Sequence, residues 1–345
     1  MKVKEVEVCS FQNWYNDFKH VTFKSIILPL PEGFVSYILK DGIVLPENCQ
    51  TNNVVTSTSD ESDDEQVSWE DCGGDKAEAP HFPEFDARIK CAIESLGGKV
   101  FPKLNWSSPR DASWIAFNNC CCCTTVSDIY LLLKSSDFII YDLTKVFSHC
   151  EDFVNSDDLN KRESSPYYLV LRKWIDMDTS GEYRCFVKDN SLIGVSQREH
   201  SLYFHHINNE KDDIVEDINN FFIQHIQPKF PCSSYVFDVY RKKKDHVYLV
   251  DFNPFGTVTE SLLFDWDELI TGTVGTNGNG LPEFRYVDDD RGVQPRPLSY
   301  HAIPRDIVDI STGEDSFKLV DLIKLKIDEQ NKAANGNDSD EDNGK

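Results

Sequence analysis

The stretch YVFDVYRKKKDHVYLVDFNPFG, residues Tyr235 to Gly256, decides the fold of the second half of the chain. Two runs rich in Val, Tyr and Phe flank a polar, lysine-rich connection, which is typical of an antiparallel β-hairpin with a solvated turn. An even-numbered turn centred on Lys243 and Lys244 would place Asp238 opposite Leu249. The sequence therefore predicts a hairpin whose register is set by its lysine-rich turn.

Side chains alternate between two faces along the second strand of this hairpin. Asp251 and Asn253 are expected to share a face with Leu249, whereas Val250 points the other way. In the predicted register Asp238 points to the same face as Asp251 and Asn253. Three side chains with oxygen donors are thus expected to converge diagonally across the hairpin.

Two carboxylates and an amide form a suitable donor set for a hard divalent cation. Mg²⁺ takes few protein oxygens and completes its octahedron with water and phosphate, so Asp238, Asp251 and Asn253 are candidate metal ligands. The residues alone leave a second interpretation open, in which acidic side chains near strand ends simply face water.

Five long runs of the chain carry a family resemblance. They are VTFKSIILPLP (Val21 to Pro31), FPKLNWSSPRDASWI (Phe101 to Ile115), LVLRKWIDMDTSGEYRCFVKDNSLIGVSQR (Leu169 to Arg198), FDVYRKKKDHVYLVDFNPFG (Phe237 to Gly256) and STGEDSFKLVDLIKLK (Ser311 to Lys326). Together they resemble the cell division cycle protein 123 family over nearly the whole chain except two acidic segments.

This resemblance implies an α+β, ATP-grasp-like fold, in which two α+β lobes with antiparallel sheets sandwich a nucleotide. The implied cofactors are ATP and Mg²⁺. The implied role is that of a chaperone for the heterotrimeric eukaryotic translation initiation factor 2, which binds the γ subunit before the other subunits join. Such a role would support translation initiation and cell-cycle progression.

The resemblance also assigns roles to individual residues. Lys103 matches a nucleotide-phosphate contact, Arg184 is expected to help neutralise phosphate, and Asp178 is expected to border the ribose. From the residues alone, an ammonium inside the apolar strand around Lys103 needs a partner, and a salt bridge to a neighbouring acid is the alternative.

A strand is predicted over YYLVLRKWI, residues Tyr167 to Ile175, and its last part, Arg172 to Ile175, resembles the segment that links the two lobes of ATP-grasp proteins. There the backbone meets the adenine edge and apolar side chains cover the ring. The implied contacts are Arg172, Lys173, Trp174 and Ile175. A buried strand with an arginine that reaches towards solvent is the structural alternative.

Composition restricts the class of protein and its partners. The chain has 345 residues, 40% hydrophobic content and a net charge of −24. Such a charge repels phosphate backbones, so we expect neither a nucleic-acid nor an anionic-membrane partner, but a basic or mixed-charge protein. With no secretory signal and eleven cysteines in no obvious paired framework, we expect a cytoplasmic monomer with reduced thiols.

The domain organisation follows from composition and resemblance together. We expect an N-terminal lobe over residues 1–165, a C-terminal ATP-grasp lobe over 166–327 and a disordered acidic tail over 328–345. A disordered acidic insertion is expected at about 51–80, because seven residues between Asp60 and Asp71 are acidic and none is basic.

Several shorter elements are predicted from periodicity. Helices are expected over Phe11 to Phe18, from Pro83 to a stop at Gly97-Gly98, around Val126 to Leu133, over Ile214 to Ile226, over Ser261 to Ile270 and near the C-terminus over Phe317 to Ile327. Strands are expected over Val21 to Leu30, Lys99 to Trp106 and Phe138 to Tyr141, with a second hairpin over Glu182 to Gln197.

Three functions are compatible with these observations. The first is an ATP- and Mg²⁺-binding assembly factor for translation initiation factor 2. The second is an ATP-dependent carboxylate-amine ligase, and the third is an acidic adaptor with a relict nucleotide fold. An obvious glycine-rich phosphate loop is missing from the sequence, so we expect a binding protein rather than an enzyme.

Overall fold

The computed structural model describes residues 1–40, 81–116, 119–153, 166–274 and 280–289. By its contacts the chain divides into two units, Met1–Pro295 and Arg296–Lys345, and the described residues belong to the first. The predicted acidic insertion, C-terminal helix and acidic tail lie outside the described residues. Among the described helices, none combines the length and the apolar composition needed to cross a bilayer.

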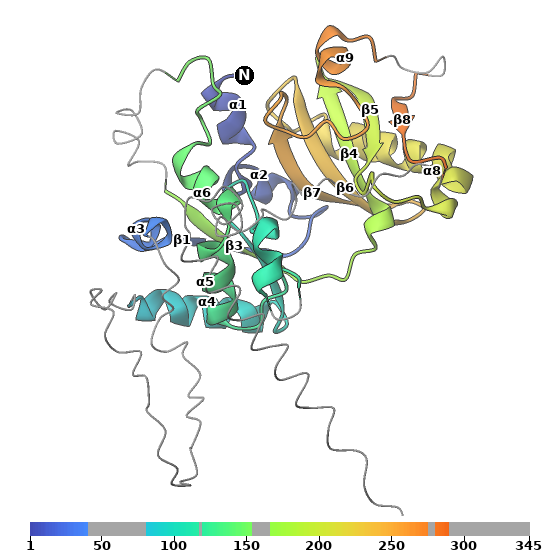
Figure 1. Ribbon diagram of the computed structural model, residues 1–345. Coiled ribbons are helices and arrows are strands. Elements are labelled where there is room, and N and C mark those ends of the chain that lie inside the picture. The colour runs from blue at the N-terminus through green and yellow to red at the C-terminus, as the bar shows by residue number, and fades with distance from the viewer. Residues whose placement is uncertain (41–80, 117–118, 154–165, 275–279, 290–345) are drawn as a thin grey trace, which may run out of the picture. The chain divides into compact units, whose positions relative to one another are not determined.

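A small antiparallel sheet forms from strands that are far apart in the sequence (Figure 1). Its order is β1 (Ser25–Pro29), β3 (Tyr168–Lys173), β2 (Val100–Lys103). Leu169, Val170 and Leu171 are fully buried, which suits the central strand of a sheet covered on both faces. The sequence-based division at residue 165 assigned this strand to the second lobe, but β3 pairs with the two strands of the first.

Helices that follow the N-terminal strands pack on the small sheet (Figure 1). They are α3 (Phe34–Leu39), α4 (Pro83–Ser95), α5 (Val126–Lys134) and α6 (Asp137–Thr144), and their apolar faces share one core with β1, β2 and β3. The predicted stop of α4 is confirmed, because Gly97 and Gly98 follow it with φ of 96° and 86°.

The predicted strand over Phe138 to Tyr141 is wrong, because these residues lie in α6. The helix is fixed at its start by two side chains rather than by its own periodicity. The Ser136 hydroxyl accepts the N–H of Ile139 at 3.2 Å. The carboxylate of Asp111, distant in sequence, accepts the N–H groups of Asp137 at 2.7 Å and Phe138 at 3.2 Å. Capping from outside the segment overrides the β-like apolar pattern.

The large sheet contains both predicted hairpins. Its order is β7 (His246–Pro254), β6 (Tyr235–Lys243), β4 (Glu182–Lys188), β5 (Ser191–Gln197), β8 (Glu283–Arg285). Neighbouring strands are antiparallel except β5 and β8, which pair in parallel. The α+β class and the largely antiparallel sheets of the prediction are confirmed.

Helices cover one face of the large sheet in a single apolar core. This core joins α8 (His205–Phe221), the following π-helical turn η5 (Phe222–Ile226) and the predicted N-terminal helix α2 (Phe11–Phe18) to strands β4, β6 and β7. A smaller core around Phe186 and Phe264 includes α9 (Trp266–Thr271), which forms only the last part of the helix predicted from Ser261. Helix α1 (Val3–Val8) precedes α2 (Figure 1).

The register predicted for the β6–β7 hairpin is wrong, because the turn is centred on Lys244 and Asp245 and the pairing shifts twice, between Arg241 and Lys243 and between Asp238 and Val239. Lys243 pairs with His246 across a two-residue turn, and Asp238 lies opposite Asp251, whereas Leu249 lies opposite Val239. The register shifts between Asp238 and Val239, which leaves Val250 as the extra residue on β7.

This bulge also changes which side chains share a face of β7. Leu249 and Phe252, three residues apart, are both in the apolar core with exposures of 0% and 1%. Leu249 therefore does not share the face of Asp251 and Asn253, contrary to the prediction. The extra residue Val250 turns the two polar side chains to the opposite face of the sheet.

Candidate functional site

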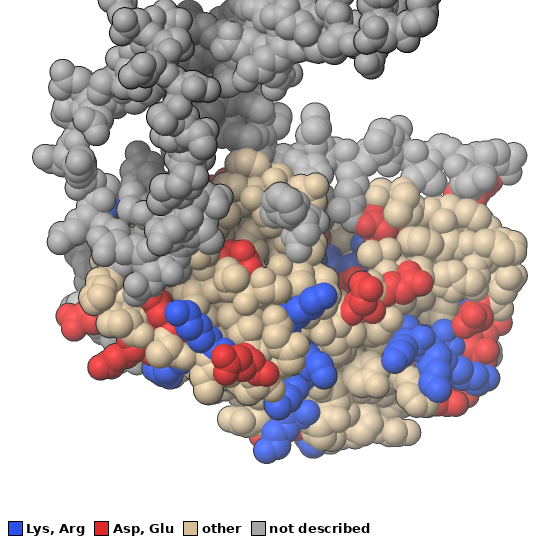
Figure 2. Space-filling model, turned by 90° about the horizontal axis from the view of Figure 1, so that it is seen from below, with Lys and Arg blue, Asp and Glu red and all other residues tan. Residues whose placement is uncertain are grey.

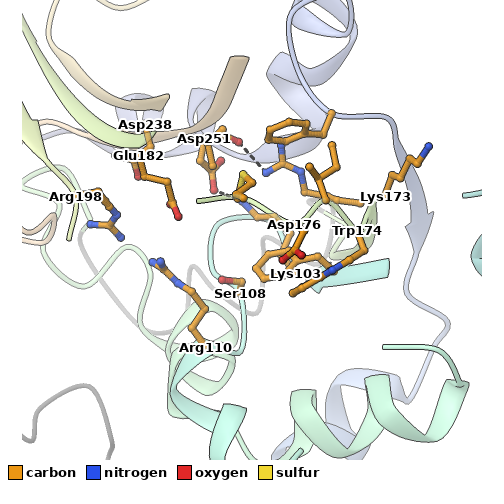
Figure 3. A pocket seen from close by; sticks show the side chains of 16 residues that line it. Lys103, Ser108, Arg110, Lys173, Trp174, Asp176, Glu182, Arg198, Asp238 and Asp251 are labelled. Atoms are coloured by element: carbon orange, nitrogen blue, oxygen red, sulfur yellow. Dashed lines mark hydrogen bonds and ion pairs between the residues drawn. The ribbon is translucent and has the colours of Figure 1, made fainter. Parts of the chain in front are cut away.

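A cavity of about 280 Å³ is lined by residues of both sheets (Figure 3). The small sheet and the segment after β3 contribute one wall, which includes Phe101 and Trp174. Strands β4, β6 and β7 contribute the opposite wall, which includes Glu182, Asp238 and Val250. The loop after β2 adds further polar groups, so the site depends on elements that are distant in the sequence.

Charged side chains dominate the cavity, although the wall around Trp174 is largely apolar. Figure 3 shows the side chains of Arg110, Glu182 and Arg198 directed towards one another, whereas Lys173 points away from them. The lining includes five basic residues, Lys103, Arg110, Arg172, Lys173 and Arg198, and four acidic ones, Asp176, Glu182, Asp238 and Asp251. In a chain with a net charge of −24, this local concentration of cations favours an anionic ligand.

One row of polar residues crosses four strands of the large sheet. Arg184 on β4 pairs in register with Ser196 on β5 and with Asp238 on β6, and Asp238 pairs in turn with Asp251 on β7. Side chains in one cross-strand row share a face, so this register brings Arg184, Asp238 and Asp251 together. The bulge at Val250 is what places Asp251 in the row.

Asp238 is held by an arginine fork. Nε of Arg184 donates to Oδ1 of Asp238 at 2.8 Å and its NH2 group donates to Oδ2 at 2.8 Å. Burial disfavours the charged carboxylate, but the nearby guanidinium groups of Arg184 and Arg198 outweigh it and lower the pKa of Asp238 to about 2. The row therefore carries a fixed negative charge at neutral pH.

Burial also shifts the pKa of two further charged groups on this wall, Arg198 and Glu182. Desolvation, together with the charge of Arg184, lowers the pKa of Arg198 to about 10. Burial raises the pKa of Glu182, against the attraction of Arg110 and Arg198. Arg184 pairs with Asp238, and NH1 of Arg198 lies 3.6 Å from a carboxylate oxygen of Glu260, whereas no ion pair of Arg110 occurs among the described residues. A bound polyanion would supply a partner for Arg110.

Lys103 from the small sheet reaches Asp251 of the large sheet (Figure 3). The Lys103 side chain is only 1% exposed, and its ammonium group donates to Oδ2 of Asp251. The backbone N–H of Phe252 donates to Oδ1 of Asp251 at 3.1 Å. Burial lowers the pKa of Lys103, and the charge of Asp251 opposes this shift. The salt bridge considered as the alternative for Lys103 is therefore present, and its partner is the predicted metal ligand Asp251.

Asn253 completes the predicted donor set. Its amide nitrogen lies 3.4 Å from Oδ2 of Asp238, so Asp238, Asp251 and Asn253 occupy one face of the hairpin, as predicted. Among the described residues there is no group of three or more His, Cys, Asp or Glu side chains placed to hold a metal. Two carboxylates and an amide oxygen still match the hard donors that Mg²⁺ takes when phosphate and water supply its other ligands.

Arg172 lies next to the last residue of β3 and is held by two side-chain hydrogen bonds. Its NH1 group donates to the Val250 carbonyl at 2.8 Å and its NH2 group to the Thr22 hydroxyl at 3.2 Å. The side chain is buried, and Nε has no hydrogen-bond partner among the described residues. This buried arginine does not reach solvent, contrary to the structural alternative for β3, and its free N–H is available near the cavity.

The remaining predicted contacts divide into two groups. Lys173, Trp174 and Ile175 line the cavity, and the Trp174 N–H donates to the Lys99 carbonyl at 3.0 Å. Asp178 does not line it. Its Oδ1 accepts the N–H and hydroxyl of Ser180 at 3.0 Å and 2.7 Å, which caps the short helical turn η4 (Thr179–Gly181).

Sequence reasoning missed Ser108, Arg110, Glu182 and Arg198 as residues of the site. Glu182 precedes Arg184 by two positions on one strand, so strand alternation could have placed both on the cavity face. Arg198 directly follows β5, and its N–H donates to the Glu182 carbonyl at 3.0 Å. Ser108 and Arg110 carry no such signal, because their place depends on contacts between their loop and a helix that is distant in the sequence.

Comparisons with known proteins agree with this architecture. A family model described as D123 matches residues 14–311. The "Translation initiation factor eIF2 assembly protein" of Xenopus tropicalis is 45% identical over 343 residues, covering 96% of this chain and 98% of the relative. The protein of that name from Kluyveromyces lactis is 35% identical over 358 residues, covering 96% and 95%.

A solved structure extends the similarity to the fold. Cdc123 from Schizosaccharomyces pombe matches with a TM-score of 0.68 and 33% identity, covering 84% of this chain and 99% of that one. The extent of these matches confirms the resemblance stated from the sequence runs. The chain therefore belongs to the D123 family, the cell division cycle protein 123 family.

Proposed function

We propose that this protein is an ATP- and Mg²⁺-binding assembly factor for eukaryotic translation initiation factor 2, and that it acts by binding the γ subunit of that factor. The relatives named as eIF2 assembly proteins in Xenopus tropicalis and Kluyveromyces lactis align with 96% of the chain. Because they match almost end to end, the same role is the simplest proposal for this chain.

The observation that carries the nucleotide proposal is the cavity between the two sheets. It combines five basic residues with two carboxylates and an adjacent amide in one cross-strand cluster. A triphosphate with a bound divalent cation needs both features, since cations neutralise the phosphate oxygens and hard oxygens hold the metal. The apolar wall at Phe101, Trp174 and Ile175 suits a planar base.

The ion pairs of the free protein suggest how the cavity would bind ATP and Mg²⁺. Lys103 now neutralises Asp251, and Arg184 neutralises Asp238. A phosphate oxygen could replace Asp251 as the partner of Lys103, and Asp251 would then be available to a cation. When bound, Mg²⁺ would supply charge neutralisation between the carboxylates and the phosphates. This exchange keeps each buried charge compensated.

The test is a pair of measurements on the full chain and on Asp251→Ala. Calorimetry should detect ATP binding in the presence of Mg²⁺, and the substitution should weaken it at least about tenfold, or about 1.4 kcal/mol. A pull-down of the γ subunit should fall in parallel. Asp213→Ala is the matched control. Asp213 lies on α8 and makes an exposed ion pair with Lys244, which lies in the β6–β7 turn.

Each result has a defined consequence. No binding heat with ATP and Mg²⁺ would overturn the nucleotide site and favour the adaptor. If Asp251→Ala pulls down the γ subunit as well as the wild type does, binding of the γ subunit does not depend on the cavity. Steady ADP release stimulated by a carboxylate substrate or a peptide would instead support the ligase.

A further inference from the structure

The segment Trp106–Asp111 brings two polar groups to the cavity. It leaves β2 just after Lys103 and enters the helical turn η3 (Arg110–Ile115), and Ser108 and Arg110 line the cavity (Figure 3). The segment contains Pro109 and no glycine. It therefore differs from a flexible glycine-rich phosphate loop, and its conformation has to be fixed by other contacts.

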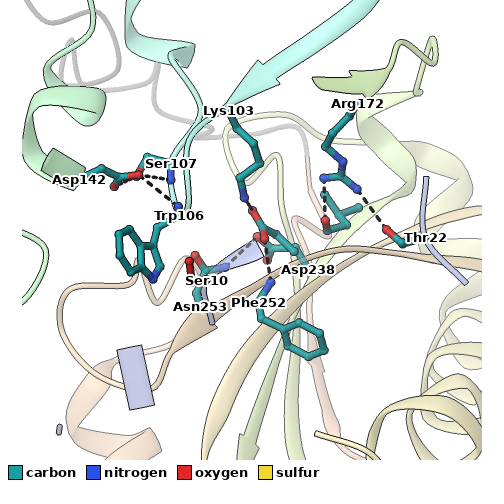
Figure 4. Close-up of polar contacts among 12 residues, drawn as sticks. Ser10, Thr22, Lys103, Trp106, Ser107, Asp142, Arg172, Asp238, Phe252 and Asn253 are labelled. Atoms are coloured by element: carbon teal, nitrogen blue, oxygen red, sulfur yellow. Dashed lines mark hydrogen bonds and ion pairs between the residues drawn. The ribbon is translucent and has the colours of Figure 1, made fainter. Parts of the chain in front are cut away.

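Helix α6 holds the beginning of this segment through Asp142 (Figure 4). One carboxylate oxygen of Asp142 accepts the N–H groups of Trp106 at 3.2 Å and Ser107 at 2.7 Å, and the other accepts the Ser107 hydroxyl at 2.6 Å. Asp142 is 1% exposed. Charge-assisted hydrogen bonds to a buried carboxylate are among the strongest that a loop can receive.

The same helix holds the end of the segment through Asp111. One oxygen of Asp111 accepts the Ser136 hydroxyl at 2.6 Å, and the other accepts the N–H groups of Asp137 and Phe138 at the start of α6. Asp111 is 5% exposed. Both ends of the segment are thus attached to one short helix, at its N-terminus and within its last turns.

Only the middle of the segment faces the cavity. The Arg110 side chain is exposed and directed towards Glu182 and Arg198, and no hydrogen bond or ion pair of its guanidinium occurs among the described residues (Figure 3). Its position depends on the backbone that carries it. Preorganised groups of this kind require support from residues that do not touch the ligand.

We infer that Asp142 and Asp111 are positioning residues, through which α6 holds Trp106–Asp111 in the conformation that presents the Ser108 hydroxyl and the Arg110 guanidinium to a bound triphosphate. The inference rests on the proposed function of the cavity. In this inference α6 does not touch the ligand but fixes the segment that contacts the phosphates. Glycine-rich loops contact phosphate by closing over it instead.

The test compares ATP with adenosine on the full chain in Mg²⁺ buffer, using calorimetry. Asp142→Ala should weaken ATP binding about tenfold and leave adenosine binding unchanged, because the segment meets only the phosphates. Asp142→Asn keeps an oxygen that can accept the Ser107 N–H, so its affinity for ATP should fall by no more than about threefold. In a Ser108→Ala/Arg110→Ala background, adding Asp142→Ala should have almost no further effect.

The control is Asp86→Ala on α4. Asp86 is also a buried carboxylate near the small sheet and accepts the Tyr130 hydroxyl at 2.5 Å, but it does not line the cavity. Its loss should lower stability without changing affinity for ATP. If Asp142→Ala does not fold, Ser107→Ala replaces it, with an expected loss of about threefold for ATP alone.

Three outcomes would overturn the inference. The first is that Asp142→Ala binds ATP as tightly as the wild type. The second is that Asp142→Ala lowers the affinity for ATP and for adenosine equally. The third is that Asp142→Ala lowers the affinity for ATP by its full amount in the Ser108→Ala/Arg110→Ala background. If the wild-type chain itself binds no ATP, the proposed function and this inference both fail. If the wild type binds ATP and Asp142→Ala binds it equally well, this inference fails and the proposed function stands.

Discussion

Asp238 and Asp251 lie opposite each other on neighbouring strands, yet each is neutralised by a cation from a different element. Arg184 on β4 holds Asp238 from within the large sheet, and Lys103 on β2 reaches Asp251 from the small sheet. Two facing carboxylates would repel each other without these partners. Each cation therefore has a structural role in the free protein in addition to the phosphate contact proposed for it.

Asp238 makes stability depend on pH in the acidic range. Its pKa falls from 3.8 to about 2 in the folded chain, so folding favours the carboxylate. The resulting stabilisation, about 2 kcal/mol, is fully present above about pH 4 and is lost as pH falls towards 2. Urea unfolding at several pH values should show the stability difference between wild type and Asp238→Asn shrinking over this window. A difference that stays constant with pH would contradict the assignment.

At the scale of elements, contacts from outside a segment decided two local structures. The bulge at Val250 sets which residues of β7 face the cavity, and Asp111 together with Ser136 begins α6 in a segment with a strand-like apolar pattern. In both cases the local sequence was compatible with a second arrangement. Burial of Leu249 and Phe252 in one core selects the bulged register, because a regular strand would expose one of them.

Ser136 should contribute measurably to the stability of α6. Its hydroxyl caps Ile139 and donates to Asp111 at 2.6 Å in a fully buried position. Ser136→Ala removes both bonds and should lower the free energy of unfolding by about 1–2 kcal/mol in chemical denaturation. Ser148→Ala is the comparison, since among the described residues that exposed hydroxyl bonds only the Lys145 carbonyl, so its loss should cost little. Equal effects of the two substitutions would argue against a cap.

At the scale of the whole molecule, both sheets contribute to one cavity, and the described surface is not uniformly acidic. Figure 2 shows basic and acidic side chains interspersed on one face. The large net charge of −24 is therefore not spread evenly, and the acidic runs at 60–71 and 328–345 account for nearly half of it. Those runs, outside the described residues, are the sequence features best suited to a basic partner surface.

Because the two sheets share the cavity, a bound nucleotide should stabilise them together. ATP with Mg²⁺ at one hundred times its dissociation constant should add about 2.7 kcal/mol to the free energy of unfolding. Thermal unfolding followed by circular dichroism and by tryptophan fluorescence should shift upwards by the same amount with both probes. The shift should fall when EDTA removes the metal. Two transitions, only one of which moves with ATP, would show that a single sheet binds the ligand.

The sequence by itself determined the elements whose pattern is local. The β6–β7 hairpin, helices α2, α4, α5 and α8, and the α+β class follow from periodicity and turn residues, and the long runs of resemblance indicated the family. The grouping of Asp238, Asp251 and Asn253 on one face was also predicted, although by a register that is wrong.

Only the tertiary structure decided how these elements meet. The membership of β3 in the small sheet, the Lys103–Asp251 ion pair and the place of Arg110 and Arg198 at the cavity all join residues far apart in the chain. A local sequence pattern indicates which face of an element is apolar. A buried charge needs a partner because it loses its hydration, and that loss occurs only when distant elements pack together.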